Sequence, residues 1–269
     1  MKKSLITCVA NNKGGVGKST TVINLATALK LLGNKVLVTD LDPQGNVAYG
    51  VGIEPYDDVY TMGDVFAGTC SLADAIISTK YFDLIPNNLY SYKKVSPRIL
   101  TNKLDKIFEA NPKVLAYYDF IIIDTPPSIE QMTLNAAYAA DILLLVTEYS
   151  KFSMVGLKIL MEVLNDIGGD SMKSKLRSMP KPILFTMYDS RVRLSKMVEQ
   201  NIEQSDTGLI LAERIARTIK IQESHYEGVP AVLRANNPAG KGYRELAAKW
   251  NEARLNKVLK GKTQTIRIK

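Results

Sequence analysis

One glycine-rich stretch, residues 11–20, combines residue types that together could bind a nucleotide, and its sequence is NNKGGVGKST. Glycine allows the backbone to turn sharply and to point successive N–H groups inward, where they can cradle phosphate oxygens. Lys18 would then place a positive charge beside the β- and γ-phosphates, and the Ser19 hydroxyl would ligate Mg²⁺. The pattern predicts a phosphate-binding loop.

The elements on either side of this stretch must position it. The apolar run from Leu5 to Ala10 predicts a buried strand, and Thr21 to Leu32 has the apolar spacing of a helix. A strand that turns through glycines into a helix N-terminus is the context that a phosphate-binding loop requires. The alternative is a glycine-rich turn with two solvated lysines, which would not require a strand before it and a helix after it.

Carboxylates follow two further strands that the sequence predicts. Residues 35–40 read KVLVTD and deliver Asp40 and Asp42, and residues 118–124 read YDFIIID and end on Asp124. Ligands of open α/β sheets bind outside the carboxyl ends of the strands, so all three are expected at the edge that holds the loop. Asp124 then occupies the place of a Walker B carboxylate that holds Mg²⁺. Turn formation or helix capping is the alternative role for each of them.

Buried strands and amphipathic helices alternate along the whole chain, which predicts an α/β fold of the P-loop NTPase class. We expect a mostly parallel, twisted sheet with helices on both faces, built as a single domain over residues 1–269 with a basic, frayed tail from about residue 260. Further strands are predicted at 82–85, 141–147, 182–188 and 209–215. Further helices are predicted at 62–67, 72–77, 97–110, 129–139, 152–166 and 242–259. Residues 168–180 have the composition of an exposed loop.

Composition excludes several classes of protein. The chain has 269 residues, 46% of them hydrophobic, which is enough for a substantial core. No apolar run approaches the ~20 residues that span a bilayer, and no signal peptide is recognisable, so we expect a cytoplasmic protein. The two cysteines, Cys8 and Cys70, are too few for a disulfide framework or a metal cluster, and we expect both to be packing residues.

Positive charge is concentrated in the last third of the chain. Residues 1–169 hold 15 Lys and Arg against 17 Asp and Glu, a net −2, whereas residues 170–269 hold 20 against 10, a net +10. Such asymmetry favours an anionic polymer or surface as partner. The alternative is a solvated basic face.

The loop departs from the usual G-x-x-x-x-G-K-[ST] pattern in a way that resembles one family. Asn12 replaces the first glycine, and Lys13 adds a second lysine, as in the deviant P-loop of the ParA/MinD group of ATPases. The strings DLDPQGN at 40–46 and DTPP at 124–127 also resemble motifs of this group. The resemblance covers nearly the whole chain, and the chain looks like a ParA-type, Soj-like DNA partition ATPase.

That resemblance implies a mechanism in which two subunits close face to face around two ATP molecules. Lys13 would neutralise charge on the partner's phosphates, so that slow, Mg²⁺-dependent hydrolysis depends on dimerisation. Asp42 would orient the attacking water and Asp40 would lie nearer the Mg²⁺, although both carboxylates reach the same edge of the sheet. The loop residues in contact with the nucleotide would be Gly14, Gly15, Val16, Gly17, Lys18, Ser19 and Thr20, with Thr20 at the α-phosphate.

The resemblance also extends to the base and to DNA. Residues 186–191, TMYDSR, look like the stretch that approaches adenine, through Met187 and Asp189, and Asn237 and Pro238 look like the loop that closes over the base. The resemblance implies non-specific contacts to DNA phosphates in the ATP-bound homodimer. The residues expected to make them are Arg191, Arg193, Lys196, Arg217 and Lys220. A ParB-like centromere-binding protein would stimulate hydrolysis, and the protein would associate with the nucleoid.

Other functions use a similar nucleotide site. A MinD-like ATPase would bind membranes through a C-terminal amphipathic helix, but residues 250–269 lack a sustained apolar stripe, so we expect no membrane partner. A reductase with an iron–sulfur cluster between its subunits would need a cysteine pair that this chain lacks. A ParA-like ATPase that positions a protein cargo is not separable by sequence from one that segregates plasmids or chromosomes. His225, the single histidine, is expected on a surface helix without a catalytic role.

Overall fold

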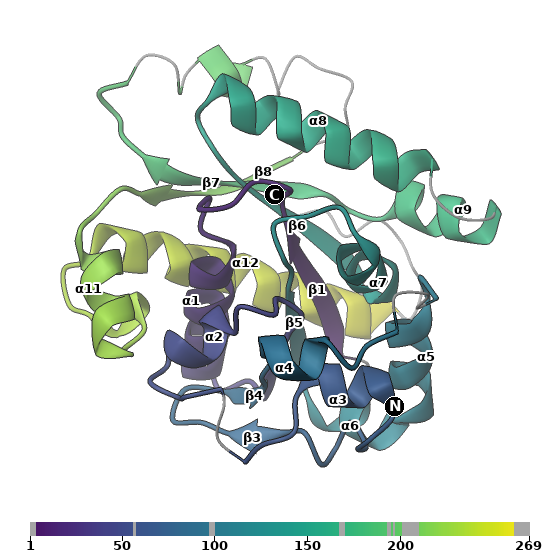
Figure 1. Cartoon of the computed structure of the whole chain (residues 1–269). Coiled ribbons are helices and arrows are strands. Elements are labelled where there is room, and N and C mark those ends of the chain that lie inside the picture. Colours follow the sequence, from purple (N-terminus) through teal and green to yellow (C-terminus); the bar gives the residue numbers. More distant parts are fainter. Residues whose placement is uncertain are drawn as a thin grey trace.

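A computed structural model of the chain describes residues 4–55, 58–96, 100–166, 170–192, 195, 197–200 and 210–260. Within these residues eight strands form one sheet, in the order β3-β4-β2-β5-β1-β6-β7-β8 (Figure 1). The strands are β1 (Leu5–Ala10), β2 (Val36–Asp40), β3 (Ile77–Ser78), β4 (Asp83–Ile85), β5 (Phe120–Asp124), β6 (Ile142–Glu148), β7 (Pro182–Tyr188) and β8 (Ile210–Ala216). Neighbouring strands pair in parallel except β3, which pairs with β4 antiparallel. The prediction of a mostly parallel sheet is confirmed.

Helices connect these strands. They are α1 (Lys18–Leu31), α2 (Asn46–Tyr49), α3 (Met62–Ala67), α4 (Leu89–Tyr92), α5 (Lys103–Ala110), α6 (Pro112–Tyr117), α7 (Gln131–Ala139), α8 (Lys151–Asp166), α9 (Asp170–Ser178), α11 (Lys220–Glu227), a short 3₁₀ helix η1 (Ala231–Leu233) and α12 (Pro238–Lys260). Among the residues that the structure describes, no helix combines the length and apolar character that a bilayer span requires.

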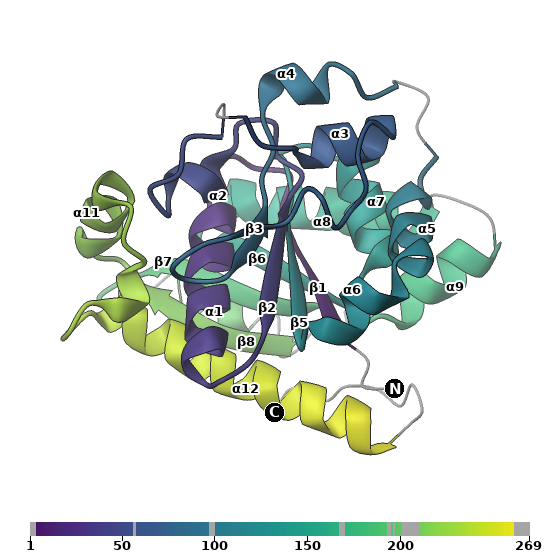
Figure 2. The same ribbon diagram turned by 90° about the horizontal axis from the view of Figure 1, so that it is seen from below.

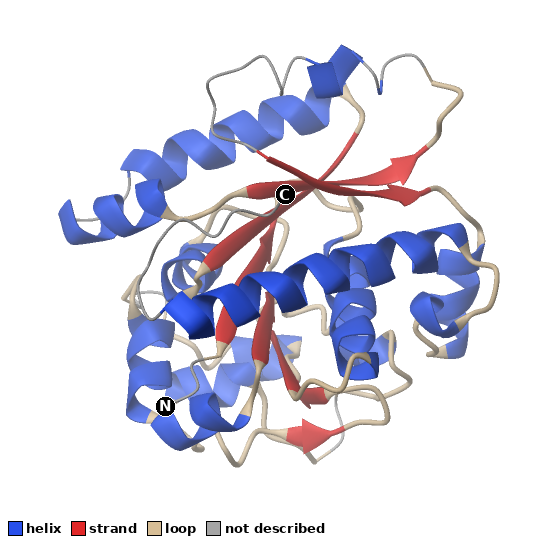
Figure 3. Ribbon diagram, turned by 180° about the vertical axis from the view of Figure 1, so that it is seen from behind, coloured by secondary structure: helices blue, strands red, loops and turns tan. Residues whose placement is uncertain are grey.

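The sheet carries a hydrophobic core on each face, because successive side chains of a strand point to opposite sides. Leu5 and Val9 of β1 pack into one core with residues of α1 and α12, whereas Ile6 and Cys8 pack into the other with residues of α5, α7 and α8. In Figure 3, α12 crosses in front of the strands. The prediction that helices cover both faces is confirmed.

The last helix, α12, is fastened to the first strand and to the strand beside it. Trp250 is fully buried, and its indole N–H donates to the Thr7 hydroxyl at 3.0 Å. The buried Arg254 forms an ion pair with Asp119, whose other carboxylate oxygen accepts the Lys35 N–H at 2.9 Å. Because a buried charge is stable only when it is paired, this contact holds α12 in one register on the sheet.

Three local expectations are wrong. Residues 170–178 form the helix α9 rather than an exposed loop, because Leu176 and Met179 are buried as anchors beneath a polar outer surface. Residues 72–77 form turns that lead into β3 rather than a helix. The helix expected from residue 97 to residue 110 begins only at Lys103, and residues 97–99 lie outside the described part. Figure 2 shows α5 and α9 on the side of the molecule away from α11.

Candidate functional site

The glycine-rich loop runs from the end of β1 at Ala10 to the start of α1 at Lys18, as the sequence predicts. Gly15 and Gly17 have φ values of +76° and +90°, a left-handed conformation that residues with a Cβ adopt only with strain. Gly17 is the residue that precedes α1, and no side chain caps the first turn, which also lacks acidic residues. The N–H groups at this helix end are therefore oriented to bind an anion.

Hydrogen bonds to two later strands hold the loop in place. The Asn11 amide donates to the Val146 carbonyl of β6 at 2.6 Å and accepts the Lys13 N–H at 2.9 Å. On the other side, the Thr186 hydroxyl of β7 donates to the Val16 carbonyl at 2.7 Å. The loop is thus fixed at both ends by hydrogen bonds, which reduces the entropy lost when it binds a ligand.

Lys18 lies within the cradle. Its side chain is buried, and its amine donates to the Lys13 carbonyl at 3.2 Å. Burial lowers the pKa of Lys18, and the nearby carboxylates of Asp124 and Asp42 partly oppose that shift. Within the described residues no carboxylate forms an ion pair with this amine. A buried ammonium without a direct counter-ion fits a site that receives an anionic group.

The three predicted carboxylates meet at the same edge of the sheet. Asp40 ends β2 and Asp124 ends β5, and the two residues are directly paired in the β2–β5 register. Asp40 accepts the Asp42 N–H at 2.9 Å and the Val47 N–H at 3.4 Å. Burial raises the pKa of Asp40 well above its ordinary value, and the charges of Asp124 and Asp42 add to that shift. The sequence therefore places these acids correctly.

Asp124 is fully buried, and neither of its carboxylate oxygens accepts a hydrogen bond of normal geometry. Burial raises the pKa of Asp124 to about 7, although the nearby Ser19 hydroxyl and Lys18 amine oppose the shift. A buried carboxylate without a donor is costly unless a cation satisfies it. Among the described residues no three His, Cys, Asp or Glu side chains converge to hold a metal unaided. Mg²⁺ at this carboxylate would take its other ligands from Ser19, water and phosphate, as is usual for nucleotide sites.

Comparison with known proteins agrees with this geometry. Residues 4–178 match the sequence profile of an AAA domain family. The chain is 32% identical over 248 residues to the chromosome partitioning protein ParA of Caulobacter vibrioides. The matched region covers 90% of this chain and 92% of that protein. The chain belongs to the ParA/MinD superfamily.

Within this superfamily the chain is a ParA-type ATPase. It is 31% identical over 251 residues to the sporulation initiation inhibitor protein Soj of Bacillus subtilis, over 90% of this chain and 96% of Soj. The septum site-determining protein MinD of Pyrococcus horikoshii, solved with Mg-ADP, has the same fold, with a TM-score of 0.75 and 26% identity over 93% of this chain and 96% of MinD. Membership implies a P-loop enzyme that hydrolyses nucleotides.

In this ParA-type chain the additional lysine, Lys13, is engaged by residues of the same chain. Its amine forms an ion pair with Glu148 at the end of β6 and donates to the Ser153 hydroxyl at 3.3 Å. This contact holds the pKa of Glu148 below its usual value. Both side chains are partly exposed, at 39% for Lys13 and 27% for Glu148, so the pair lies at the surface beside the phosphate loop.

The stretch expected near adenine, residues 186–191, comprises the end of β7 and the turn after it. Met187 has a φ of +54°, a left-handed conformation that is uncommon for a residue with a long side chain. Its exposed fraction is 42%. Asp189 accepts two hydrogen bonds from the Arg191 guanidinium, at 2.9 Å and 2.6 Å, and this contact lowers the pKa of Asp189 to about 2. The carboxylate is thus occupied by Arg191, which the sequence did not predict.

Asn237 directly precedes α12, and Pro238 is the first residue of that helix. The buried Asn237 amide donates to the Ala231 carbonyl at 3.0 Å, and its oxygen accepts the Ala239 N–H at 3.1 Å. Pro238 takes the first helical position, where a missing N–H costs nothing. Their contact with a base stays a prediction.

The residues expected to bind DNA occupy several settings. Arg191 is 88% exposed although it pairs with Asp189. Arg217 is also exposed, and the Lys220 amine donates to the Asn236 carbonyl at 3.2 Å. Arg193 and Lys196 lie outside the described residues. Arg191 and Arg217 lie near one another, because the Arg217 N–H donates to the Tyr188 carbonyl at 2.9 Å and the positive charge of Arg217 also acts on Asp189.

Sequence reasoning missed the residues that reach the loop from a distance. Glu148 and Thr186 contact the loop although more than a hundred residues separate each of them from it. His225 of α11 has its Nε2 atom 3.1 Å from the Thr20 hydroxyl. Glu148 and Thr186 each had a usable signal, since Glu148 directly follows the strand predicted at 141–147 and Thr186 lies near the end of the strand predicted at 182–188, at the edge that binds ligands.

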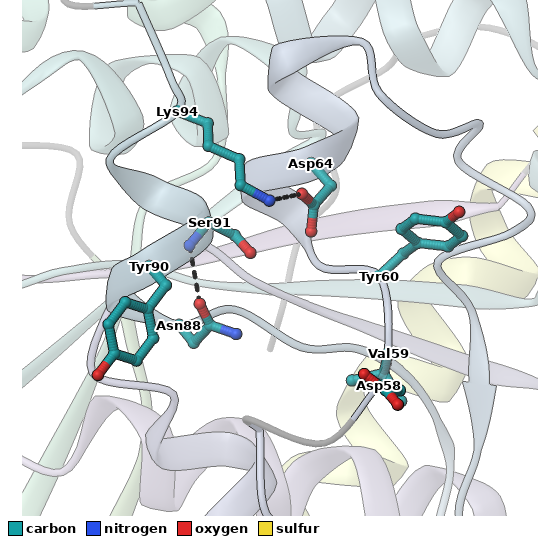
Figure 4. Close-up of a pocket in the computed structure, with 8 residues that line it drawn as sticks. All are labelled: Asp58, Val59, Tyr60, Asp64, Asn88, Tyr90, Ser91 and Lys94. Atoms are coloured by element: carbon teal, nitrogen blue, oxygen red, sulfur yellow. Dashed lines mark hydrogen bonds and ion pairs between the residues drawn. The ribbon is translucent and has the colours of Figure 1, made fainter.

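A separate hollow of about 530 Å³ lies between α3 and α4 (Figure 4). The Lys94 amine pairs with the buried Asp64 at 2.9 Å, and the rings of Tyr60 and Tyr90 stand on opposite sides of the hollow. None of the predicted site residues lines it. The candidate nucleotide site is therefore identified by its phosphate-binding loop and buried carboxylates, and not by this hollow.

Proposed function

We propose that this chain is an ATP-dependent, dimerising partition ATPase that binds DNA without sequence specificity in its ATP-bound state and segregates plasmid or chromosome copies. The observation that carries the proposal is the unsatisfied, buried carboxylate of Asp124 beside an open phosphate cradle. The names of two relatives, a chromosome partitioning protein and a sporulation initiation inhibitor, support the cellular role.

The proposed site is specific for a nucleotide with Mg²⁺. Ser19 and Asp124 would hold the cation, with Asp40 beside them. Bound there, Mg²⁺ would neutralise charge on the phosphates and on these carboxylates. Lys18 would exchange its bond to a backbone carbonyl for the β- and γ-phosphates. Asp42, which accepts the Gln44 N–H at 3.0 Å, is held in place to orient a water molecule for attack.

Lys13 is the proposed link between nucleotide and dimer. To reach the phosphates of a second subunit, its amine must leave Glu148. Ion pairs between partly exposed side chains contribute about 0–1 kcal/mol, so this exchange is inexpensive. In the single subunit Lys13 would thus rest in a surface ion pair with Glu148, which the phosphates bound to a second subunit can replace.

The dimer proposal is tested with Lys13→Ala. This variant should bind ATP but lose ATP-dependent dimerisation, measured by light scattering after size exclusion, and lose hydrolysis. Glu148→Gln, which keeps the shape of the side chain and removes the competing anion, should dimerise at a lower protein concentration than the wild type. Equal hydrolysis by wild type and Lys13→Ala would refute the role of this lysine.

The DNA proposal is tested by binding to duplex DNA with ATP, with ADP and without nucleotide over a salt series. We expect tight binding only with ATP, with a steep decline as salt rises. Arg217→Ala should weaken binding to all sequences alike, whereas Lys80→Ala should not, since Lys80 lies beside β3 at the opposite edge of the sheet. Binding that ignores nucleotide and salt would refute the switch. Sedimentation with liposomes in ATP would instead favour a membrane-associated, MinD-like role.

A ParB-like centromere-binding protein is the proposed stimulating partner, and association with the nucleoid would follow from DNA binding. Addition of such a protein should raise the slow basal rate of ATP hydrolysis. If DNA is bound but no centromere complex stimulates hydrolysis, a protein cargo becomes the better candidate.

A further inference from the structure

The helix α11 brings His225 to the phosphate loop. Its imidazole Nε2 lies 3.1 Å from the hydroxyl of Thr20, which is the third residue of α1. Figures 1 and 2 both show α11 beside the first turns of α1. A residue in the last third of the chain therefore touches a residue that the family resemblance places at the α-phosphate.

This contact belongs to a fixed arrangement of α11 and η1 on α1. The Asn24 side chain, one turn beyond Thr20, accepts the Val232 N–H at 2.8 Å and donates to the Thr20 carbonyl at 2.8 Å. Gly228 ends α11 with a φ of +64°, and a Cβ at this position would lie 2.7 Å from the Cα of Gly52. Close backbone packing at the C-terminal end of α11 and the buried hydrogen bond from η1, which follows it, keep this segment in position.

Either atom can donate in the Thr20 contact, depending on which imidazole nitrogen carries the proton. A hydroxyl carries one proton and can accept two hydrogen bonds. If the hydroxyl donates to the imidazole, its proton is not available to a phosphate. If an imidazole Nε2–H donates to the hydroxyl, the Thr20 proton is free to point into the cradle. Within the described residues the ring makes no other hydrogen bond, so His225 can serve as the donor.

We propose that His225 is a positioning residue of the nucleotide site, which donates a hydrogen bond to Thr20 and so directs the Thr20 hydroxyl proton to the α-phosphate of a bound nucleotide. The inference rests on the proposed ATP site and adds to it a residue outside the loop. Burial lowers the pKa of His225, which favours the neutral ring with one N–H donor near pH 7.

The test measures affinity for ADP with Mg²⁺ by isothermal titration calorimetry on the full chain. His225→Ala removes the donor and should weaken binding about five-fold, the usual worth of one neutral hydrogen bond. His225→Gln keeps an N–H donor at similar reach and should restore most of the affinity. Tyr226→Ala, a neighbouring side chain that is 95% exposed, is the matched control and should bind as the wild type does.

A double-mutant cycle with Thr20→Val separates positioning from general support of the fold. In that background the hydroxyl is gone, so His225→Ala should cause no further loss. The inference is overturned if His225→Ala binds ADP as well as the wild type does, or if it weakens binding equally with and without the Thr20 hydroxyl. Thermal melts without nucleotide confirm that the variants are folded. If the wild type itself fails to bind ADP, the proposed ATPase fails rather than this inference.

Discussion

Replacement of Asp124 by asparagine should stabilise the nucleotide-free protein. Asp124 is fully buried, and its oxygens accept no hydrogen bond of normal geometry. Burial raises its pKa from 3.8 to about 7, so the charged form is disfavoured in the fold. Because a tenfold change in proton affinity corresponds to about 1.4 kcal/mol, this rise in pKa costs the folded state about 4 kcal/mol once the group is ionised.

The sign of the pH dependence follows from the same shift. The folded carboxyl holds its proton to a higher pH than the unfolded one, so its contribution to stability is present below the unfolded pKa and is lost as pH rises through about 7. Asp124→Asn removes this loss. The free energy of unfolding of the variant should exceed that of the wild type by up to about 4 kcal/mol near pH 8 and by only about 1–2 kcal/mol near pH 5.

The assay is urea unfolding of both proteins at these two pH values in the presence of a metal chelator. Asp166→Asn is the control, because Asp166 is exposed and its replacement should change stability by less than about 0.5 kcal/mol. With ADP and Mg²⁺ the order should reverse, because ligand binding stabilises the wild type and much less the variant. A variant that is less stable than the wild type at both pH values, or a gain that does not depend on pH, would refute the reasoning.

Three further substitutions test particular contacts. Gly156→Ala should displace Asn12 and weaken nucleotide binding, because a Cβ at position 156 would lie 2.5 Å from the Asn12 side-chain oxygen. Calorimetry measures the affinity, and an unchanged value would show that Asn12 can move without cost to binding. Trp250→Phe should lower the free energy of unfolding by about 1–3 kcal/mol, since it removes a buried hydrogen bond and part of a large side chain; a loss below the error of urea unfolding would contradict this. Arg254→Met should cost about 3–5 kcal/mol in the same measurement, because Asp119 then keeps a buried charge without its partner, and an additional Asp119→Asn should restore part of the loss.

The parts of the site that the sequence predicted are those that lie close together along the chain. Gly15, Gly17 and Lys18 occupy a turn between a strand and a helix, and local backbone requirements alone explain their types. Asp40 and Asp124 were predicted because each ends an apolar strand, and parallel strands bring their carboxyl ends to one edge. Local pattern and sheet geometry were sufficient for these residues.

The parts that could not be predicted depend on packing between distant segments. Nothing near Glu148 in the sequence indicates that it pairs with Lys13, and nothing near His225 indicates Thr20. Both contacts depend on how β6 and α11 are placed against the loop. The same limitation explains α9, whose few apolar anchors are visible only once α7 and α8 are in place beside it.

The unpredicted contacts share a physical feature that bears on function. Lys13 lies within the loop and Thr20 in the first turn of the helix that follows it, and each has a side chain that could bind phosphate but is engaged by a later segment instead. The Lys13 contact competes with phosphate, because an ammonium held by Glu148 must leave it to meet another anion. The Thr20 contact need not compete, because a hydroxyl that accepts from His225 can still donate. Under the proposed function, Lys13 would therefore change its partner when ATP and a second subunit bind, whereas Thr20 would keep its partner, and these opposite expectations can be tested separately with Glu148→Gln and His225→Gln.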